Sequence, residues 1–234
     1  MKLLFAGPSL RGVETPPGLG LRPPAGKGDI CRAVEEGVDV IGLIDGYFET
    51  TAAVWHKEIL HALSSGVRVF GAASIGALRA AECAVFGMKG IGAIFEAYAA
   101  GRIEDDAEVA LLHAPRELGY APLSEPLVNV RATLDRLLRD GSIDGNQFQR
   151  LTEAASSIFY KERTWRAILV AALRSSDERA HIGGLVRSFR VDQKAIDAMA
   201  LMRAVELADD ARLTEAPGWE FSHTSYFGML ATQG

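Results

Sequence analysis

Short apolar runs in the first third of the chain alternate with amphipathic stretches. The runs Leu3–Ala6, Val38–Ile44 and Val67–Ala72 consist mostly of aliphatic or small residues, which is typical of strands buried on both faces. The stretches between them repeat apolar residues every three to four positions, as helices with one buried face do. This alternation predicts an α/β fold for the N-terminal half, with a mostly parallel sheet and crossover helices.

Three helices are predicted around these strands. The first is Asp29–Glu36, with Asp29 at its start, and the second begins at Thr50 or Thr51 and stops before Gly66. The third is Ser74–Phe86. The predicted buried stripe of the second helix is Trp55, Ile59, Ala62 and Leu63, and that of the third is Ile75, Leu78, Ala81, Val85 and Phe86.

The remainder of the chain follows other patterns. The segment Arg11–Lys27 is rich in proline and glycine without apolar periodicity, so we predict a loop. We predict an α/β core over residues 1–122 and an all-helical C-terminal part over residues 123–234, packed on the core. The helical patterns of that second part are Val128–Arg139, Gly145–Tyr160, Thr164–Arg174 and Asp192–Ala208.

The net charge and the hydropathy of the chain argue against two classes of protein, those that bind nucleic acid and those that span a membrane. The net charge is −5, and neither half of the chain has the basic excess of a nucleic-acid-binding protein. No stretch approaches the roughly 20 apolar residues of a membrane span. The apolar run at the N-terminus is interrupted by Gly7 and Pro8 and is too short for a signal sequence. We therefore expect a cytoplasmic protein that binds neither nucleic acid nor membrane.

The cysteine content points to the same compartment. The two cysteines, Cys31 and Cys83, have no disulfide or metal-site spacing, as expected in a reducing environment. Both fall in predicted helices without an electropositive loop, so neither has the surroundings of a reactive thiolate.

The segment Val69–Ala77 is the most suggestive candidate for catalysis. It runs from a strand through a small-residue turn into a helix, and Ala72-x-Ser74-x-Gly76 resembles the G-x-S-x-G nucleophile elbow. In such an elbow the serine hydroxyl projects at the carboxyl end of the sheet. The backbone N–H groups of Ile75 and Gly76 would then stabilise an oxyanion. The alternative is that Ser74 only caps its helix.

A nucleophilic serine needs a base, and no histidine after Ser74 has a recognisable hydrolase context. A lysine held in its neutral form can serve, and Lys57 is the candidate. Helical periodicity places His56 on the apolar side of its helix and Lys57 and Glu58 on the flanks. The alternatives are a solvent-exposed Lys57 and a His56 that belongs to the core.

Further polar residues are expected near Ser74. Arg79 and Glu82 are three residues apart, and Glu82 points into the predicted stripe, so the two should pair. Ser9 and Asp45 follow the first and second predicted strands and would share the sheet edge with Ser74, where parallel sheets bind ligands. The alternative for Asp45 is an exposed turn residue.

The segment Glu104–Glu108 holds four carboxylates in five residues. Such a group offers oxygen ligands for Mg²⁺, but a solvated acidic turn has the same composition. There is also no P-loop or G-x-G-x-x-G motif. We expect no metal site and no cofactor.

Taken together, the chain resembles the TfuA-like family. The resemblance covers roughly the first half, and the long block around Ser74 is its most specific part. The matching segments are Gly7–Leu10, Pro23–Asp29, Ile44–Phe48, Val54–Leu60, Phe70–Glu82, Phe86–Met88 and Glu104–Ala110.

The resemblance implies a function in backbone thioamidation of peptides or proteins. TfuA-like proteins accompany ATP-dependent YcaO enzymes, hydrolyse a thiocarboxylated ubiquitin-like sulfur carrier of the ThiS type, and improve binding of the peptide substrate by the YcaO enzyme. The family's site is a Ser–Lys pair, which falls here on Ser74 and on Lys57, with Lys27 as the rival lysine. Ile75 stands where a methionine is expected.

Two other classes of function stay open. The first is a non-catalytic adaptor that docks a YcaO enzyme through Asp45, His56 and the acidic segment Glu104–Glu108. The second is a nucleotide- or metal-dependent enzyme whose site lies where the strand order reverses.

Overall fold

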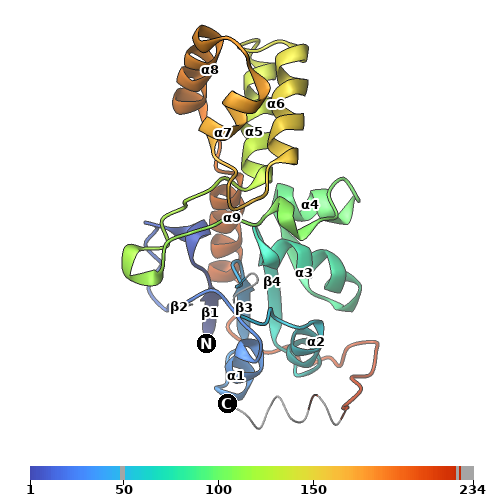
Figure 1. Ribbon diagram of the computed structural model, residues 1–234. Helices are drawn as coiled ribbons and strands as arrows, with labels where there is room; N and C mark the ends of the chain where they lie inside the picture. Colours follow the sequence, from blue (N-terminus) through green and yellow to red (C-terminus); the bar gives the residue numbers. More distant parts are fainter. Residues whose placement is uncertain (48–50, 225–226, 228–234) are drawn as a thin grey trace. The chain divides into compact units, whose positions relative to one another are not determined.

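The computed structural model describes residues 1–47, 51–224 and 227, and the chain divides into two compact units (Figure 1). The first unit comprises Met1–Glu104 and Ala195–Gly234, and the second comprises Asp105–Lys194. These bounds differ from the predicted ranges 1–122 and 123–234, because the last long helix, α9 (Gln193–Leu207), returns to the sheet of the first unit.

The first unit contains a five-stranded parallel sheet, which confirms the predicted α/β fold. The pairing of Phe5 with Leu43, and of Leu43 with Gly71, brings the carboxyl ends of β1, β3 and β4 to one edge. The strands are β1 (Lys2–Phe5), β2 (Leu19–Arg22), β3 (Val40–Leu43), β4 (Arg68–Ala72) and β5 (Lys89–Ile91), in the order β2-β1-β3-β4-β5.

The two edge strands were not predicted. β2 lies inside Arg11–Lys27, so the prediction that this whole segment is a loop was wrong. Its Leu-Gly-Leu-Arg sequence has little apolar signal, since Leu19 is buried but Leu21 is 49% exposed. Hydrogen bonding to β1 on one side stabilises the strand instead.

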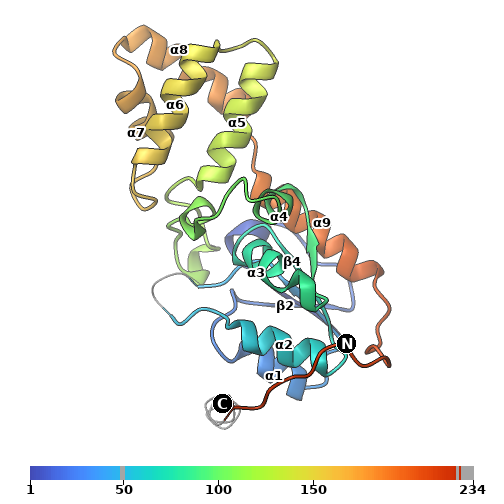
Figure 2. The same cartoon turned by 90° about the vertical axis from the view of Figure 1, so that its right-hand side faces the viewer.

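Helices cover both faces of the sheet (Figure 2). On one face, α1 (Asp29–Glu35), α2 (His56–Ser64) and α3 (Ile75–Cys83) contribute to a core with alternate residues of β1, β3 and β4. On the other face, α9 packs against the remaining strand residues. The strands are therefore buried on both sides, which explains their continuous apolar sequences. Beside α3 lies α4 (Ala93–Ala99).

The second unit is helical, as predicted for most of its length. Its helices share one core of aliphatic residues that includes Leu134, Leu137, Leu151 and Ile168. These helices are α5 (Leu127–Arg139), α6 (Gly145–Ser157), α7 (Trp165–Ala172) and α8 (Ser176–Phe189).

Helix α8 was missed in the sequence because Gly183 and Gly184 indicated a break. Gly183 is instead buried inside the helix, and a Cβ there would lie 3.3 Å from Leu169 Cδ1. The glycine therefore permits close packing of α8 on α7. Short 3-10 turns complete the chain at Pro8–Leu10, Ala84–Phe86, Asp106–Glu108 and Arg116–Leu118. None of the helices in the described part of the chain is long and apolar enough to cross a lipid bilayer.

Candidate functional site

Ser9 and Asp45 meet at the carboxyl ends of β1 and β3. The Asp45 carboxylate accepts hydrogen bonds from the Gly7 N–H (2.9 Å), the Ser9 N–H (3.0 Å) and the Ser9 hydroxyl (2.7 Å). Asp45 is 2% exposed, which excludes the alternative of an exposed turn aspartate. The strand order reverses between β1 and β3, and parallel sheets of this type bind ligands at that point.

Ser74 follows β4 on a turn that is tighter than an ordinary strand–helix connection. Its N–H donates to the Ala72 carbonyl at 2.8 Å, which closes a three-residue γ-type turn around Ala73. Ala73 has a φ of 66°, in the left-handed region that alanine rarely occupies. Strained backbone of this kind concentrates at functional sites. Ser74 itself is 8% exposed.

Two glycines make the turn possible. A Cβ on Gly76 would lie 1.9 Å from the Leu43 oxygen, and a Cβ on Gly71 would lie 2.1 Å from the Gly76 oxygen. The start of α3 therefore sits directly against β3 and β4. The sequence pattern predicted a sharp turn from the small residues two positions before and after Ser74, Ala72 and Gly76. The close approach at Gly71, three positions before Ser74, was not predicted.

The side chain of Ser74 does not make the hydrogen bond of a helix cap to α3, a helix whose residues are all described. The interpretation of Ser74 as a simple capping residue therefore lacks its defining contact. Of the two N–H groups expected to stabilise an oxyanion, that of Gly76 already donates to the Ile44 carbonyl at 3.2 Å. The Ile75 N–H is thus the better candidate donor.

The two candidate lysines lie on different segments. The Lys57 amine, at the start of α2, donates to the Ser222 carbonyl and to the Thr224 hydroxyl, both at 3.1 Å. The Lys27 amine lies 4.0 Å from the centroid of the Trp55 ring, a cation–π contact. The pairing of Ser74 with either lysine stays a prediction.

Arg79, Glu82 and His56 form a polar network that joins α3 to the start of α2. Arg79 Nη1 lies 2.5 Å from Glu82 Oε2, which confirms the predicted ion pair, and His56 Nε2 lies 2.8 Å from the same oxygen. Arg79 Nε also donates to the Val54 carbonyl at 3.1 Å. The Arg79 side chain is 14% exposed, so the network places a largely covered cation between the two helices.

The predicted buried stripe of the third helix was correct at Ile75 and wrong at its other positions. Helix α3 ends at Cys83, Val85 is 82% exposed, and Glu82 lies on the exposed side. Small residues dominate the buried face because Gly76 lies against the Leu43 oxygen of β3, and Gly76 and Ala80 lie against Gly71 of β4, where larger side chains do not fit. The residues that it buries are Ile75, Gly76, Ala77, Ala80 and Cys83.

Helix α2 buries Ile59, Ala62 and Leu63 as predicted, but His56 is exposed and Glu58 is wholly buried, contrary to the prediction. Glu58 accepts hydrogen bonds from the Gly28 N–H (2.7 Å) and the Trp55 N–H (3.2 Å). Burial raises the pKa of the Glu58 carboxyl, and these N–H groups partly oppose that rise. Its position three residues after Trp55 is that of the acid in a capping box, a signal that was overlooked. The predicted helix start at Thr51 is likewise corrected to His56, and Thr50 lies outside the described residues.

Two carboxylates of the acidic segment Glu104–Glu108 have partners within the protein. The Asp105 carboxylate accepts from the Ala107 N–H at 2.8 Å, and Glu108 pairs with Arg131 at 3.1 Å. No cluster of three or more metal-ligating side chains occurs in the residues that the structure describes. The segment therefore shows no arrangement of carboxylates around a common point.

Both cysteines are buried free thiols. Burial raises the pKa of Cys31 to about 12 and that of Cys83 to about 11. Neither environment favours the thiolate that persulfide chemistry requires.

The fold and the site define a doubly wound α/β protein with a serine on a strained strand–helix turn after β4 and a buried Ser–Asp pair at the carboxyl ends of β1 and β3. The family model described as "TfuA-like protein" matches residues 45–164, just over half of the 234 residues. The chain belongs to the TfuA-like family. The matched region includes Lys57 and Ser74, whereas Ser9 and Lys27 precede it. No curated protein matches the chain significantly.

Proposed function

We propose that this protein is an accessory hydrolase for YcaO-dependent backbone thioamidation, which releases sulfide from a thiocarboxylated ubiquitin-like carrier. Membership of the TfuA-like family supports the association with a YcaO enzyme. The observation that carries the hydrolase proposal is the strained turn at Ala73, which holds Ser74 at the carboxyl edge of the sheet. The two free cysteines fit a reducing, cytoplasmic setting.

In the proposed reaction, a neutral lysine takes the proton of the Ser74 hydroxyl as its oxygen attacks the thiocarboxylate carbon. The tetrahedral intermediate places its oxyanion at the Ile75 N–H. The C–S bond breaks, the lysine returns its proton to sulfur, and an ester forms on Ser74. Water then hydrolyses this ester. The net conversion is RCOS⁻ + H₂O → RCOO⁻ + H₂S.

Cations near the turn would offset the negative charge of the thiocarboxylate. Arg79 is the best placed by its position on α3, although its pairing with Glu82 reduces its net effect. Lys57 and Lys27 both stay candidates for the base. If Lys57 acts, its amine must exchange the contacts with Ser222 and Thr224 for the Ser74 hydroxyl.

The test is incubation of the purified protein with a thiocarboxylated carrier, with sulfide and carrier mass followed over time. Ser74→Ala should reduce sulfide release to the rate without protein. Loss of the base should cost about 100-fold or more. Lys57→Ala and Lys27→Ala, tested separately, identify which lysine acts. Ser64→Ala, at the opposite end of α2 from Lys57, and Lys161→Ala, in the second unit, are matched controls that should retain full activity.

Sulfide release by Ser74→Ala at the wild-type rate would refute the hydrolase proposal. Binding of the YcaO enzyme, measured by size-exclusion chromatography, should persist in all of these variants. This retained binding distinguishes a catalytic defect from a folding defect.

A non-catalytic adaptor is the second candidate. The observation that favours it is that the Lys57 amine is hydrogen-bonded to Ser222 and Thr224. An adaptor would raise the affinity of a YcaO enzyme for its peptide without hydrolysis. If Ser74→Ala and both lysine variants support thioamidation at the wild-type rate, the adaptor explains the protein's function.

A further inference from the structure

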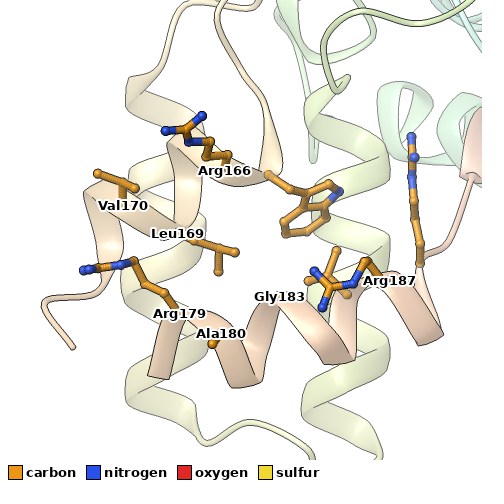
Figure 3. Close-up of a pocket in the computed structure, with 10 residues that line it drawn as sticks. Arg166, Leu169, Val170, Arg179, Ala180, Gly183 and Arg187 are labelled. Atoms are coloured by element: carbon orange, nitrogen blue, oxygen red, sulfur yellow. The ribbon is translucent and has the colours of Figure 1, made fainter. Parts of the chain in front are cut away.

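A pocket of about 590 Å³ lies between α7 and α8 of the second unit (Figure 3). Its size falls in the range of ligand-binding sites. All of the residues that line it are described, and none is acidic. They are Trp165, Arg166, Leu169, Val170, Arg179, Ala180, Gly183, Val186, Arg187 and Arg190.

The pocket concentrates positive charge in an acidic protein. Residues 161–190 carry seven Lys and Arg against three Asp and Glu, a local charge of +4 in a chain of net charge −5. Arg190 is paired with Glu125 at 2.9 Å, and Arg179 donates to the Leu173 carbonyl at 2.7 Å, at the end of α7. These two arginines therefore have structural partners.

Arg166 and Arg187, the other two arginines that line the pocket, differ from Arg179 and Arg190 in their contacts. Both are exposed, and neither has a hydrogen-bond or ion-pair partner within the described ranges 1–47, 51–224 and 227. They come from different helices, and both line the same pocket (Figure 3). Two unpaired guanidinium groups on the two helices that form the pocket are well suited to carboxylates, which accept paired hydrogen bonds from arginine.

The pocket also has an apolar surface. Leu169 and Val186 are largely buried, whereas Val170 is 61% exposed, so the lining offers apolar surface to a bound side chain. The Trp165 indole N–H is buried and has no acceptor among the described residues. An unsatisfied N–H costs about 1–3 kcal/mol, so a small rotation of the ring towards an incoming carbonyl would be favourable. The site therefore combines cations, apolar surface and an unused donor.

We infer that this pocket binds an acidic segment of a partner polypeptide, with carboxylates on Arg166 and Arg187 and an apolar side chain over Leu169 and Val170. Inorganic phosphate would leave the apolar surface unused. A nucleic acid would need a basic surface that extends well beyond one pocket. The inference concerns the second unit alone and does not depend on hydrolysis at Ser74.

The test uses fluorescence anisotropy with the full-length protein and a labelled synthetic peptide in which Glu and Asp flank two leucines. The Arg166→Ala/Arg187→Ala double variant should bind this peptide about tenfold more weakly or worse, since it loses two charge-assisted contacts. Arg174→Ala is the matched control because Arg174 is exposed on the same segment and does not line the pocket. It should bind like the wild type. Circular dichroism should show the same thermal unfolding for all three proteins.

Two further peptides and two competitors make the test specific. Replacing the acids with Gln and Asn, or the leucines with glycine, should each weaken binding about tenfold. Added phosphate and single-stranded RNA should compete poorly. Equal binding by the double variant and the wild type overturns the inference. So does equal binding of the leucine and glycine peptides, or tighter binding of RNA.

Discussion

Replacing Gly76 with alanine tests whether α3 really starts in contact with β3. A Cβ at this position would lie 1.9 Å from the Leu43 oxygen, while ordinary van der Waals contact begins at 3.4 Å. The start of α3 must therefore move by the difference, about 1.5 Å. That shift breaks the hydrogen bond from the Gly76 N–H to the Ile44 carbonyl, which is 3.2 Å long.

Two separate effects lower the free energy of unfolding of the Gly76→Ala variant. Overpacking a well-packed site costs typically about 1–3 kcal/mol. Loss of one buried backbone hydrogen bond adds about 1 kcal/mol. The free energy of unfolding should fall by about 2–4 kcal/mol, which lowers the urea midpoint by about 1–2 M for an m-value of about 2 kcal/mol/M.

Equilibrium urea unfolding, followed by tryptophan fluorescence, is the assay. A Trp165→Phe background leaves Trp55 and Trp219, both in the first unit, as the reporters. Gly218→Ala is the matched control because nothing lies within 4 Å of the position that its new Cβ would take, and it should change stability by less than about 0.5 kcal/mol. If Gly76→Ala unfolds at the same urea concentration as this control, α3 does not begin against β3, and the proposed geometry of the Ser74 turn is wrong.

Three further predictions concern buried ionisable groups. Because burial raises the pKa of Cys31 to about 12 and of Cys83 to about 11, iodoacetamide at pH 8 should leave both thiols of the folded protein unmodified and alkylate both in urea, as intact mass will show. The Cys31→Ala/Cys83→Ala variant should keep its sulfide release, and an inactive variant would favour persulfide chemistry instead. Burial also raises the pKa of Glu58 above its usual 4.5, so the folded state binds this proton more tightly than the unfolded state. The stability of the wild type relative to Glu58→Gln should therefore fall as pH rises from 4.5 through the folded pKa. Urea midpoints at pH 5 and pH 8 measure this, and a relative gain at pH 8 would contradict it.

The central strands could be predicted from the sequence because burial on both faces leaves a continuous apolar run. Val38–Ile44 and Val67–Ala72 contain β3 and β4 for this reason. The edge strand β2 has one neighbour and one exposed side, so its Leu-Gly-Leu-Arg sequence carries no such signal. Pairing with β1 decides its conformation, and that is a tertiary effect.

Those parts of the site that depend only on the order of strands and loops along the chain could be predicted. Ser9, Asp45 and Ser74 each follow a strand, and parallel strands bring such positions to one edge. Periodicity predicted most of the buried face of α2, namely Ile59, Ala62 and Leu63, but it did not predict the buried face of α3 beyond Ile75, because the space beside that helix determines the face. Gly71 and Gly76 bring α3 so close to the sheet that alanine is buried there, while Val85 stays exposed.

A comparison among the helix starts of this chain argues that Ser74 is more than a cap. Asp144, Thr164 and Ser175 each adopt the extended backbone usual for an N-cap and accept a hydrogen bond from their helix. Ser74 has a φ of −114° and a ψ of −130°, makes no such bond to α3, and follows Ala73 in a left-handed conformation. A residue in a sparsely populated backbone region costs about 1–3 kcal/mol. A capping residue does not require this backbone strain. Presentation of a hydroxyl at the sheet edge does require the strain, because only a sharp turn directs the side chain to that edge.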